Sequence, residues 1–335
     1  FANRDWVVVG SLNNLTGESV FDEALESALK IGLEQSKYVN VLPDLKVRDT
    51  VKRMESDPDA TKVDRSVGSE VAIRDGAKAL ILPTVAEIGG RVRITAEVID
   101  PHTQTTVYSE SADGTGAESV LASLDEINGK LRVRLGEALA TVTSESQPLQ
   151  QVATRNLDAL RAYSLASRNY MQGRFAEAME LYQQALAIDP QFSAAQLRIG
   201  AAYTSLGKSA EARSAFEKAA SNPDRLARRE QLYVESMLAT IDGVEDSLTK
   251  WAALTEMYPD FFAASGGYTF MAWRDANRFD EAILEVAEAG VSAKNPGPLP
   301  AKLMLGILYL GNERYDDAIR TFRAEHIDKG PEIVP

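Results

Sequence analysis

The sequence predicts an α/β amino-terminal domain with a mixed sheet over residues 1–147, followed by an all-α superhelix of paired helices over residues 148–335. Two observations predict this architecture. In the first part of the chain, short β-branched runs alternate with stretches of helical periodicity. In the second part, small and aromatic residues recur with a period of 34, which is typical of stacked helical pairs. Pro148 lies in the predicted linker between the two domains.

The elements of the first domain follow from these patterns in chain order. Leu25, Leu29 and Leu33 fall at helical spacing after the first β-branched run, and Pro43 ends the second run. Glycine pairs and Asp-Pro sequences mark the later turns. The predicted strands are residues 6–9, 39–42, 79–85, 91–99 and 105–109. The predicted helices are residues 22–35, 45–54, 64–75 and, roughly, 118–143.

The helical repeats are recognised by residue types that return at fixed offsets. Gly173, Ala178, Tyr182 and Ala185 recur 34 residues later as Gly207, Ala212, Phe216 and Ala219. Ala166 and Gly200 are the small residues of the preceding helices. Small residues at these offsets let two helices approach closely, and the aromatic residue fills the groove of the next unit. This pattern resembles the tetratricopeptide repeat family.

The repeat can be followed to the end of the array with steps of 35 or 36 residues. The continuing positions are Ser247, Ala282 and Ala318 for the alanine, and Trp251, Val286 and Phe322 for the aromatic residue. We therefore expect about five repeats, the third and fourth of them degenerate. Residues 295–298, which read Asn-Pro-Gly-Pro, should form a longer loop between the fourth and fifth repeats. The array should end near Ile327.

The composition of the 335-residue chain argues against several classes of function. A formal net charge of −13 argues against general binding to nucleic acid or anionic lipid. No apolar run approaches the length of a membrane-spanning helix, and the absence of cysteine excludes disulfides and thiolate chemistry. Because the chain begins at Phe1, we expect a fragment or a processed chain, with any signal peptide or membrane helix upstream.

No sequence pattern predicts catalysis, a cofactor or a metal site. Residues 207–209 (Gly-Lys-Ser) resemble the end of a phosphate-binding loop, but Ala202 stands where that loop needs glycine. His102 and His326 are the only histidines, and they cannot build a zinc site by themselves without cysteine. The aspartates of residues 57–64 lack the glycine and glutamate of an EF-hand loop. We interpret these features as turns and solvated side chains, and expect this chain not to be an enzyme.

The remaining candidate site is the concave surface of the repeats. In the family that the pattern resembles, helix A of each repeat lines a groove that commonly binds extended peptides. The predicted groove residues are Tyr163, Ser167, Tyr170, Met171, Leu197, Ala201, Thr204, Arg229, Leu232, Ser236, Met271, Arg274, Leu303 and Ile307. They predict a protein or peptide partner with an apolar or aromatic segment and acidic contacts to Arg229 and Arg274. The alternative is that the apolar members only pack against the next helix A. The lysine/asparagine clamp of chaperone-binding members is absent.

A second candidate site is the loop after the first predicted strand. Asn13, Asn14, Thr16 and Gly17 lie where ligands of open α/β sheets often bind. Gly114 begins another loop that could hold an anion at a helix start. A small-molecule-binding domain is therefore an alternative function, and a structural turn is the alternative interpretation of both loops.

The first domain also resembles a domain of known signalling proteins. The resemblance is carried by residues 14–17 (Asn-Leu-Thr-Gly) before Phe21 and Asp22, by residues 39–43, and by residues 98–101 (Val-Ile-Asp-Pro). With these motifs, the predicted order of strands and helices is similar to that of an α/β domain found in bacterial one-pass signalling proteins. In those proteins the domain precedes tetratricopeptide repeats outside the membrane. The nearest resemblance is to peptide-modification-system cyclases. It implies a periplasmic or extracytoplasmic location, with a membrane helix and a cytoplasmic winged-helix, kinase or nucleotide-cyclase module upstream.

We therefore expect a non-catalytic interaction and sensor segment that binds a protein or peptide. Binding would be transmitted by a change in the placement of the two domains or by formation of a homodimer. No cofactor and no nucleic acid is expected, and the membrane would be reached only through an upstream anchor. A further alternative is a non-catalytic fragment of an enzyme whose active part lies before residue 1.

Overall fold

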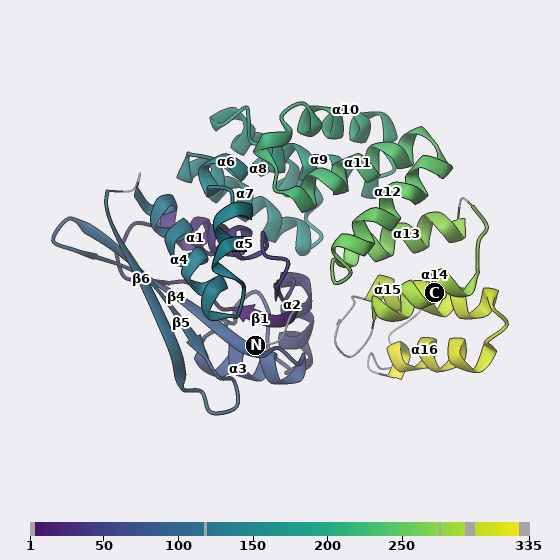
Figure 1. Ribbon diagram of the computed structural model, residues 1–335, viewed down its shortest axis with the longest axis horizontal. Helices are drawn as coiled ribbons and strands as arrows, with labels where there is room; N and C mark the ends of the chain where they lie inside the picture. Colours follow the sequence, from purple (N-terminus) through teal and green to yellow (C-terminus); the bar gives the residue numbers. More distant parts are fainter. Residues whose placement is uncertain (1–3, 117–118, 275, 292–298, 328–335) are drawn as a thin grey trace. The chain divides into compact units, whose positions relative to one another are not determined.

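The computed structural model describes residues 4–116, 119–274, 276–291 and 299–327. The chain divides into two compact units, Phe1–Val234 and Glu235–Pro335. The first unit contains a sheet with its covering helices and the first two helical pairs, and the second contains the last two pairs (Figure 1). The boundary falls within the helix Arg228–Asp242. An α/β region with a mixed sheet is thus followed by an all-α region, as predicted.

The sheet of the first unit has six strands within the described residues. The strands are β1 (Asp5–Val9), β2 (Asn13–Asn14), β3 (Val39–Val41), β4 (Ala79–Ile88), β5 (Arg91–Ile99) and β6 (Thr106–Thr115). They are ordered β3-β1-β4-β5-β6, and β2 pairs with β4. Pairs among β1 to β4 are parallel, whereas β5 and β6 are antiparallel to their neighbours. β2 was not predicted, and β6 continues past the predicted end at residue 109.

Apolar side chains cover both faces of this sheet. On one face, α1 (Val20–Leu33) and α4 (Val120–Arg134) bury side chains such as Val7. On the other face, α2 (Asp44–Arg53) and α3 (Arg65–Arg74) bury Val8. Neighbouring residues of β1 face opposite layers because side chains alternate along a strand. The sheet is therefore the middle layer of the α/β region (Figure 1).

The predicted single helix over residues 118–143 is wrong, because two helices occupy this segment. They are α4 (Val120–Arg134) and α5 (Leu139–Glu145). Between them Gly136 has a φ of +103°, a left-handed conformation that glycine adopts without the penalty of a Cβ atom. The next residue, Glu137, is buried and accepts hydrogen bonds of 2.7 Å from Arg132 Nε and Nη2. A buried bidentate ion pair thus stabilises the break.

The segment after Pro148 is a short buried helix, α6 (Leu149–Val152). Its first residue, Leu149, is fully buried, and the Leu149 amide donates to Asp125 Oδ1 of α4 at 2.9 Å. Residues 148–234 belong to the same compact unit as the sheet. The core around α1 also continues into the first helical pairs, where it includes Leu160, Tyr163 and Phe192.

Helical pairs follow α6, as the 34-residue period predicts. In the part of the chain that the structure describes there are five pairs: α7 (Leu157–Met171) with α8 (Phe175–Ile188), α9 (Ser193–Ser205) with α10 (Ser209–Ala220), α11 (Arg228–Asp242) with α12 (Val244–Met257), α13 (Phe262–Arg274) with α14 (Glu281–Ala289), and α15 (Leu299–Gly311) with α16 (Tyr315–Ile327). The loop predicted at residues 295–298 lies outside the described residues.

The two helices of a pair approach closely where helix A carries glycine. A methyl group at Gly200 of α9 would meet the Phe216 ring of α10 at 2.8 Å. The same contact recurs in the last pair, where a methyl group at Gly306 would collide with the ring of Phe322. The predicted close approach of the two helices of a pair is therefore confirmed. In these two contacts the aromatic ring packs against the glycine of its own pair, whereas we predicted that it fills the groove of the next unit.

Candidate partner-binding site

The inner face of the first helical pairs lies against α1 of the α/β region. Three arginines of the repeats lie near acids of α1 or of its C-cap residue, Glu34. Arg161 Nε lies 3.9 Å and Arg168 Nη1 lies 3.4 Å from the Glu23 carboxylate, and Arg229 Nη2 lies 2.8 Å from the Glu34 carboxylate. Opposite charges therefore face each other across this internal contact.

Arg229, which we predicted as an acidic-partner contact, is already paired inside the chain. Besides Glu34, its guanidinium binds Glu230 Oε1 at 2.9 Å. Burial alone would lower the pKa of Arg229, but Glu230 and Glu34 raise it above its ordinary value. The side chain is thus a fixed cation between two carboxylates, and an acidic ligand would have to compete with both of them.

The predicted aromatic groove residues of α7 are also bonded to neighbouring helices. Tyr163 is buried, and its ring centroid lies 5.0 Å from that of Phe192. Ser167 Oγ lies 3.0 Å from the Tyr182 hydroxyl, and Tyr170 makes the same kind of contact, 3.0 Å, with Ser205 Oγ. Burial raises the pKa of Tyr182, so this phenol stays protonated at physiological pH. These contacts connect α7 with α8 and α9.

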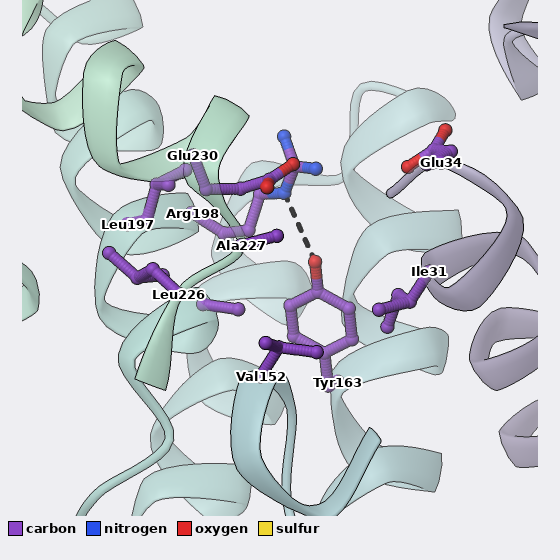
Figure 2. Close-up of a pocket in the computed structure, with 10 residues that line it drawn as sticks. Ile31, Glu34, Val152, Tyr163, Leu197, Arg198, Leu226, Ala227 and Glu230 are labelled. Atoms are coloured by element: carbon purple, nitrogen blue, oxygen red, sulfur yellow. Dashed lines mark hydrogen bonds between the residues drawn. The ribbon is translucent and has the colours of Figure 1, made fainter. Parts of the chain in front are cut away.

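A cavity of about 40 Å³ opens between α1 and the repeats. Two of the predicted groove residues, Tyr163 and Leu197, line it together with residues that were not predicted. The full lining is Ile31, Glu34, Val152, Tyr163, Ala194, Leu197, Arg198, Leu226, Ala227 and Glu230 (Figure 2). Helices α1, α6, α7, α9 and α11 each contribute to it, so the cavity forms only when the α/β region and the repeats pack together.

Arg198 is the cation of this cavity. Its Nε donates to the Tyr163 hydroxyl at 3.2 Å, as Figure 2 shows. Its side chain is exposed, and among the described residues its two terminal nitrogens have no hydrogen-bonding partner. A guanidinium carries five N–H donors, so four of them remain available. The arrangement offers a fork of donors beside a phenol and an apolar wall.

The remaining predicted groove residues do not converge on this cavity. Met171 is half-buried, Leu232 is buried, and the Thr204 hydroxyl donates to the Gly200 carbonyl of its own helix at 3.0 Å. Met271 and Arg274 belong to the second unit, where Met271 is buried and the Arg274 guanidinium lies 4.4 Å from the Phe270 ring centroid. A partner-binding role for these residues stays a prediction. The other positions that we predicted are half-buried (Ala201, Ile307), buried (Ser236) or exposed (Leu303).

The predicted ligand loop is a hydrogen-bonded turn. Asn14 Oδ1 accepts from the amide and the hydroxyl of Thr16 at 3.0 and 2.7 Å, and Asn14 Nδ2 donates to Asp22 Oδ1 at 2.8 Å. Asn13 is exposed and pairs with Thr84 of β4, and Gly17 has a φ of +81°. The polar groups of Asn14 therefore support the structural-turn interpretation, and ligand binding there stays a prediction.

The weaker sequence motifs have structural positions. Gly207 and Lys208 lie in the turn between α9 and α10, and Ser209 is the first residue of α10. Asp59 pairs with Arg48 at 2.7 Å, and Asp64 caps α3 by accepting from the Ser66 and Val67 amides. Within the described residues, histidine and acidic side chains do not form a group of three or more that could hold a metal ion. No helix of the described residues has both the length and the apolar character needed to cross a bilayer.

Sequence reasoning missed Arg198 and the α1 residues Ile31 and Glu34. Arg198 carried a weak signal, since it directly follows Leu197, the predicted groove residue that lies 34 residues after Tyr163. The α1 residues carried no such signal, because their approach to the repeats depends on tertiary packing.

Comparison with known proteins identifies the repeat. A family model described as tetratricopeptide repeat matches residues 170–227, so the chain contains a tetratricopeptide repeat, a fold that suggests protein–protein interaction. The chain matches no curated protein.

Three solved structures are similar to parts of the chain. A thermophilic tetratricopeptide-repeat protein of Thermus thermophilus is 16% identical over 52% of this chain and 92% of its own, with a TM-score of 0.43. YrrB, a repeat protein with an unusual peptide-binding site, is 19% identical over 52% and 88%, with a TM-score of 0.34. The carboxy-terminal domain of LpoB from Escherichia coli is 14% identical over 35% and 86%, with a TM-score of 0.32.

Proposed function

We propose that this chain is a protein-interaction segment whose cavity beside α1 binds a carboxylate of a protein or peptide partner. The observation that carries the proposal is the free fork of Arg198 donors in a cavity that also contains the Tyr163 hydroxyl. A guanidinium presents paired N–H groups that match the two oxygens of a carboxylate.

The size and the walls of the cavity support this ligand class. A water-sized group needs about 10–15 Å³ of such space, so the cavity of about 40 Å³ has room for roughly three heavy atoms, as many as a carboxylate contains. Ile31, Val152 and Leu226 supply apolar surface around it. An apolar residue next to the carboxylate would therefore gain contact area.

The charges around the cavity agree with a single anionic group. Glu34 and Glu230 line it, but Arg229 is paired with both of them. The charges of Arg198 and Arg229 are balanced by those of Glu34 and Glu230. A ligand with many negative charges would therefore gain little binding energy in this cavity. The acidic contact that we first assigned to Arg229 is better assigned to Arg198.

Peptide arrays test this proposal. Matched peptides that end in a free carboxylate or in an amide, with and without internal acidic residues, distinguish a chain terminus from a side chain. For a bound peptide, Arg198→Ala should weaken affinity at least about tenfold, since a charge-assisted hydrogen bond is lost. Arg198→Lys should be intermediate because lysine cannot bind bidentately.

A matched control is Arg213→Ala, which removes an arginine of α10 that pairs with Glu217 away from the cavity. It should leave affinity unchanged. The proposal is wrong if no peptide binds, or if binding is the same for Arg198→Ala and the native chain.

We further propose that the segment works outside the cytoplasm in a bacterial membrane-anchored signalling protein, with any nucleotide-cyclase activity upstream. Support for this comes from the resemblance of residues 14–17, 39–43 and 98–101 to that group. The α1 wall of the cavity would couple partner binding to the α/β region. We expect the gene to encode an apolar run of about 20 residues before Phe1. We also expect a reporter that works only in the periplasm to be active when it is fused after residue 335. A reporter active only in the cytoplasm would contradict it.

A further inference from the structure

The outer edge of β6 is a long strand edge in the first unit. β6 has ten residues, Thr106–Thr115, and it ends the strand order of the sheet. Within the described strands, its hydrogen-bonded neighbour in the sheet is β5. An unpaired strand edge presents amide and carbonyl groups that can pair with another strand.

Backbone alternation identifies the residues on this edge. The Ile81 and Val85 carbonyls of β4 accept hydrogen bonds from Gly10 and Leu15, so the odd-numbered residues of β4 point away from β5. The antiparallel register pairs Val85 with Ile94, and Ile94 with Ala112. Because the backbone N–H and C=O groups of successive residues point to opposite sides of a strand, those of Ile94 point toward β6 and those of Ala112 point toward β5. The neighbouring residues of β6 therefore point outward.

The outward residues include Ser109, Ser111 and Asp113. One observation agrees with this assignment: the Lys130 ammonium of α4 donates to the Ser111 carbonyl at 3.1 Å. A carbonyl has two lone pairs, so this contact leaves one of them open. β6 contains no proline, which is a common means of blocking an edge.

We infer that the β6 edge pairs with the β6 edge of a second copy of this chain, antiparallel and centred on Ser111. In this register, Ser111 faces Ser111 of the partner subunit. Asp113 faces Ser109 of the partner subunit, and Glu110 faces Ala112 of the partner subunit. No like charges lie directly opposite each other, which is the arrangement that stabilises paired strands.

The carboxylates of the strand are also neutralised within their own copy. Glu110 is paired with Arg134 at 2.7 Å, and Asp113 with Arg93 at 2.6 Å. Glu110 of the partner subunit would lie one residue from Ser111 and so near the Lys130 ammonium. Lys130 is also paired with Glu126 of its own helix at 2.6 Å, and the partner's glutamate would be a second acidic neighbour of this cation. Since strand pairing alone forms a small interface, we expect a weak, concentration-dependent homodimer.

Charge substitutions on the axis test both the dimer and its register. Ser111 is exposed, so Ser111→Asp and Ser111→Lys should not disturb the fold. Each places two like charges opposite each other, and sedimentation equilibrium of the full 335-residue chain should show dimerisation weakened at least about fivefold. A 1:1 mixture of the two variants should restore it, because an aspartate then faces a lysine.

The control is Gln184→Glu, which adds one negative charge on the exposed face of α8, away from the sheet. It should dimerise as the native chain does. The inference is overturned if the native chain remains monomeric at about 1 mM, if Ser111→Asp dimerises like the native chain, or if the mixture fails to restore association.

Discussion

Helix α4 of the α/β region ends in a different way from the first helices of the repeats. In the repeats, Gly173 and Gly207 turn the chain with φ of +75° and +69°, and a methyl group at either position would meet no atom within 4 Å. In the α/β region, Gly136 turns the chain with φ of +103°, and a methyl group there would meet the Tyr38 ring at 3.0 Å. The first kind of turn is local, whereas the second depends on neighbours far along the chain.

Substitution between repeats shows how tolerant the local turn is. The equivalent positions of the fourth and fifth pairs hold Asn277 and Glu313, with φ of +49° and +58°. The turn is thus kept in repeats that lack the glycine. We attribute this to the two flanking helices, whose packed apolar faces hold the turn in place. The Gly136 turn instead depends on the buried pair of Arg132 and Glu137, with Ser36 Oγ also donating to Glu137 at 2.7 Å.

The largest expected effect is at this buried pair. Arg132→Ala should lower the free energy of unfolding by about 3–5 kcal/mol, because it leaves the Glu137 carboxylate buried without its cation. Urea denaturation monitored by circular dichroism measures the change. The control, Arg134→Ala, removes an exposed arginine two residues later that pairs with Glu110, and should cost at most about 1 kcal/mol. Equal losses of unfolding free energy in the two variants would show that the buried pair contributes no more than an exposed one.

Gly136→Ala should have the next largest effect. Alanine at a φ of +103° is strained by about 1–3 kcal/mol, and its methyl group would also press on Tyr38. We expect a loss near the upper end of that range in the same denaturation experiment. A loss no larger than that of Gly173→Ala would show that the Gly136 turn is as local as those of the repeats.

The pH dependence of stability should distinguish the two helix caps at the junction. Asp125 caps α6, whereas the neutral Asn156 caps α7 by accepting from the Asp158 and Ala159 amides. Burial raises the pKa of Asp125 to about 6, and the bond from Leu149 only partly offsets this. Because the folded state then binds the proton of Asp125 more tightly than the unfolded state, the contribution of Asp125 to stability falls as pH rises from about 4 to 6.

The measurement is the unfolding free energy of Asp125→Asn relative to the native chain at pH 4 and pH 8. From pH 4 to pH 8, the unfolding free energy of the variant should rise by about 1 kcal/mol relative to that of the native chain. This value allows for the partial exposure of Asp125 to solvent. The matched variant Asn156→Ser should show no such pH dependence. A difference in unfolding free energy between Asp125→Asn and the native chain that stays constant, or falls, from pH 4 to pH 8 would contradict the prediction.

The smallest expected effect is at the repeat turn. Gly173→Asn should cost less than about 1 kcal/mol, since asparagine tolerates the left-handed conformation and already occupies position 277. Thermal unfolding of this variant should lie close to that of the native chain. A large loss would mean that the first repeat needs its glycine for a reason beyond φ.

The sequence by itself determined the local pattern. The β-branched runs and the apolar spacing of Leu25, Leu29 and Leu33 predicted β1 and α1, and the 34-residue period predicted the helical pairs. These signals succeed because a buried face needs a fixed spacing of apolar side chains, and close helix contact needs a small residue such as Gly200. The candidate loop at Asn14 was located by the same local reasoning.

Tertiary structure alone decided what lies against the inner face of the repeats. The pairing of Arg229 with Glu34, 195 residues apart, cannot be read from the spacing along the chain. The break at Gly136 was missed because helical periodicity continues across it, and only the buried partner of Glu137 favours the turn over one more helical residue. Periodicity reports which face of an element is buried; it does not report which distant element covers that face.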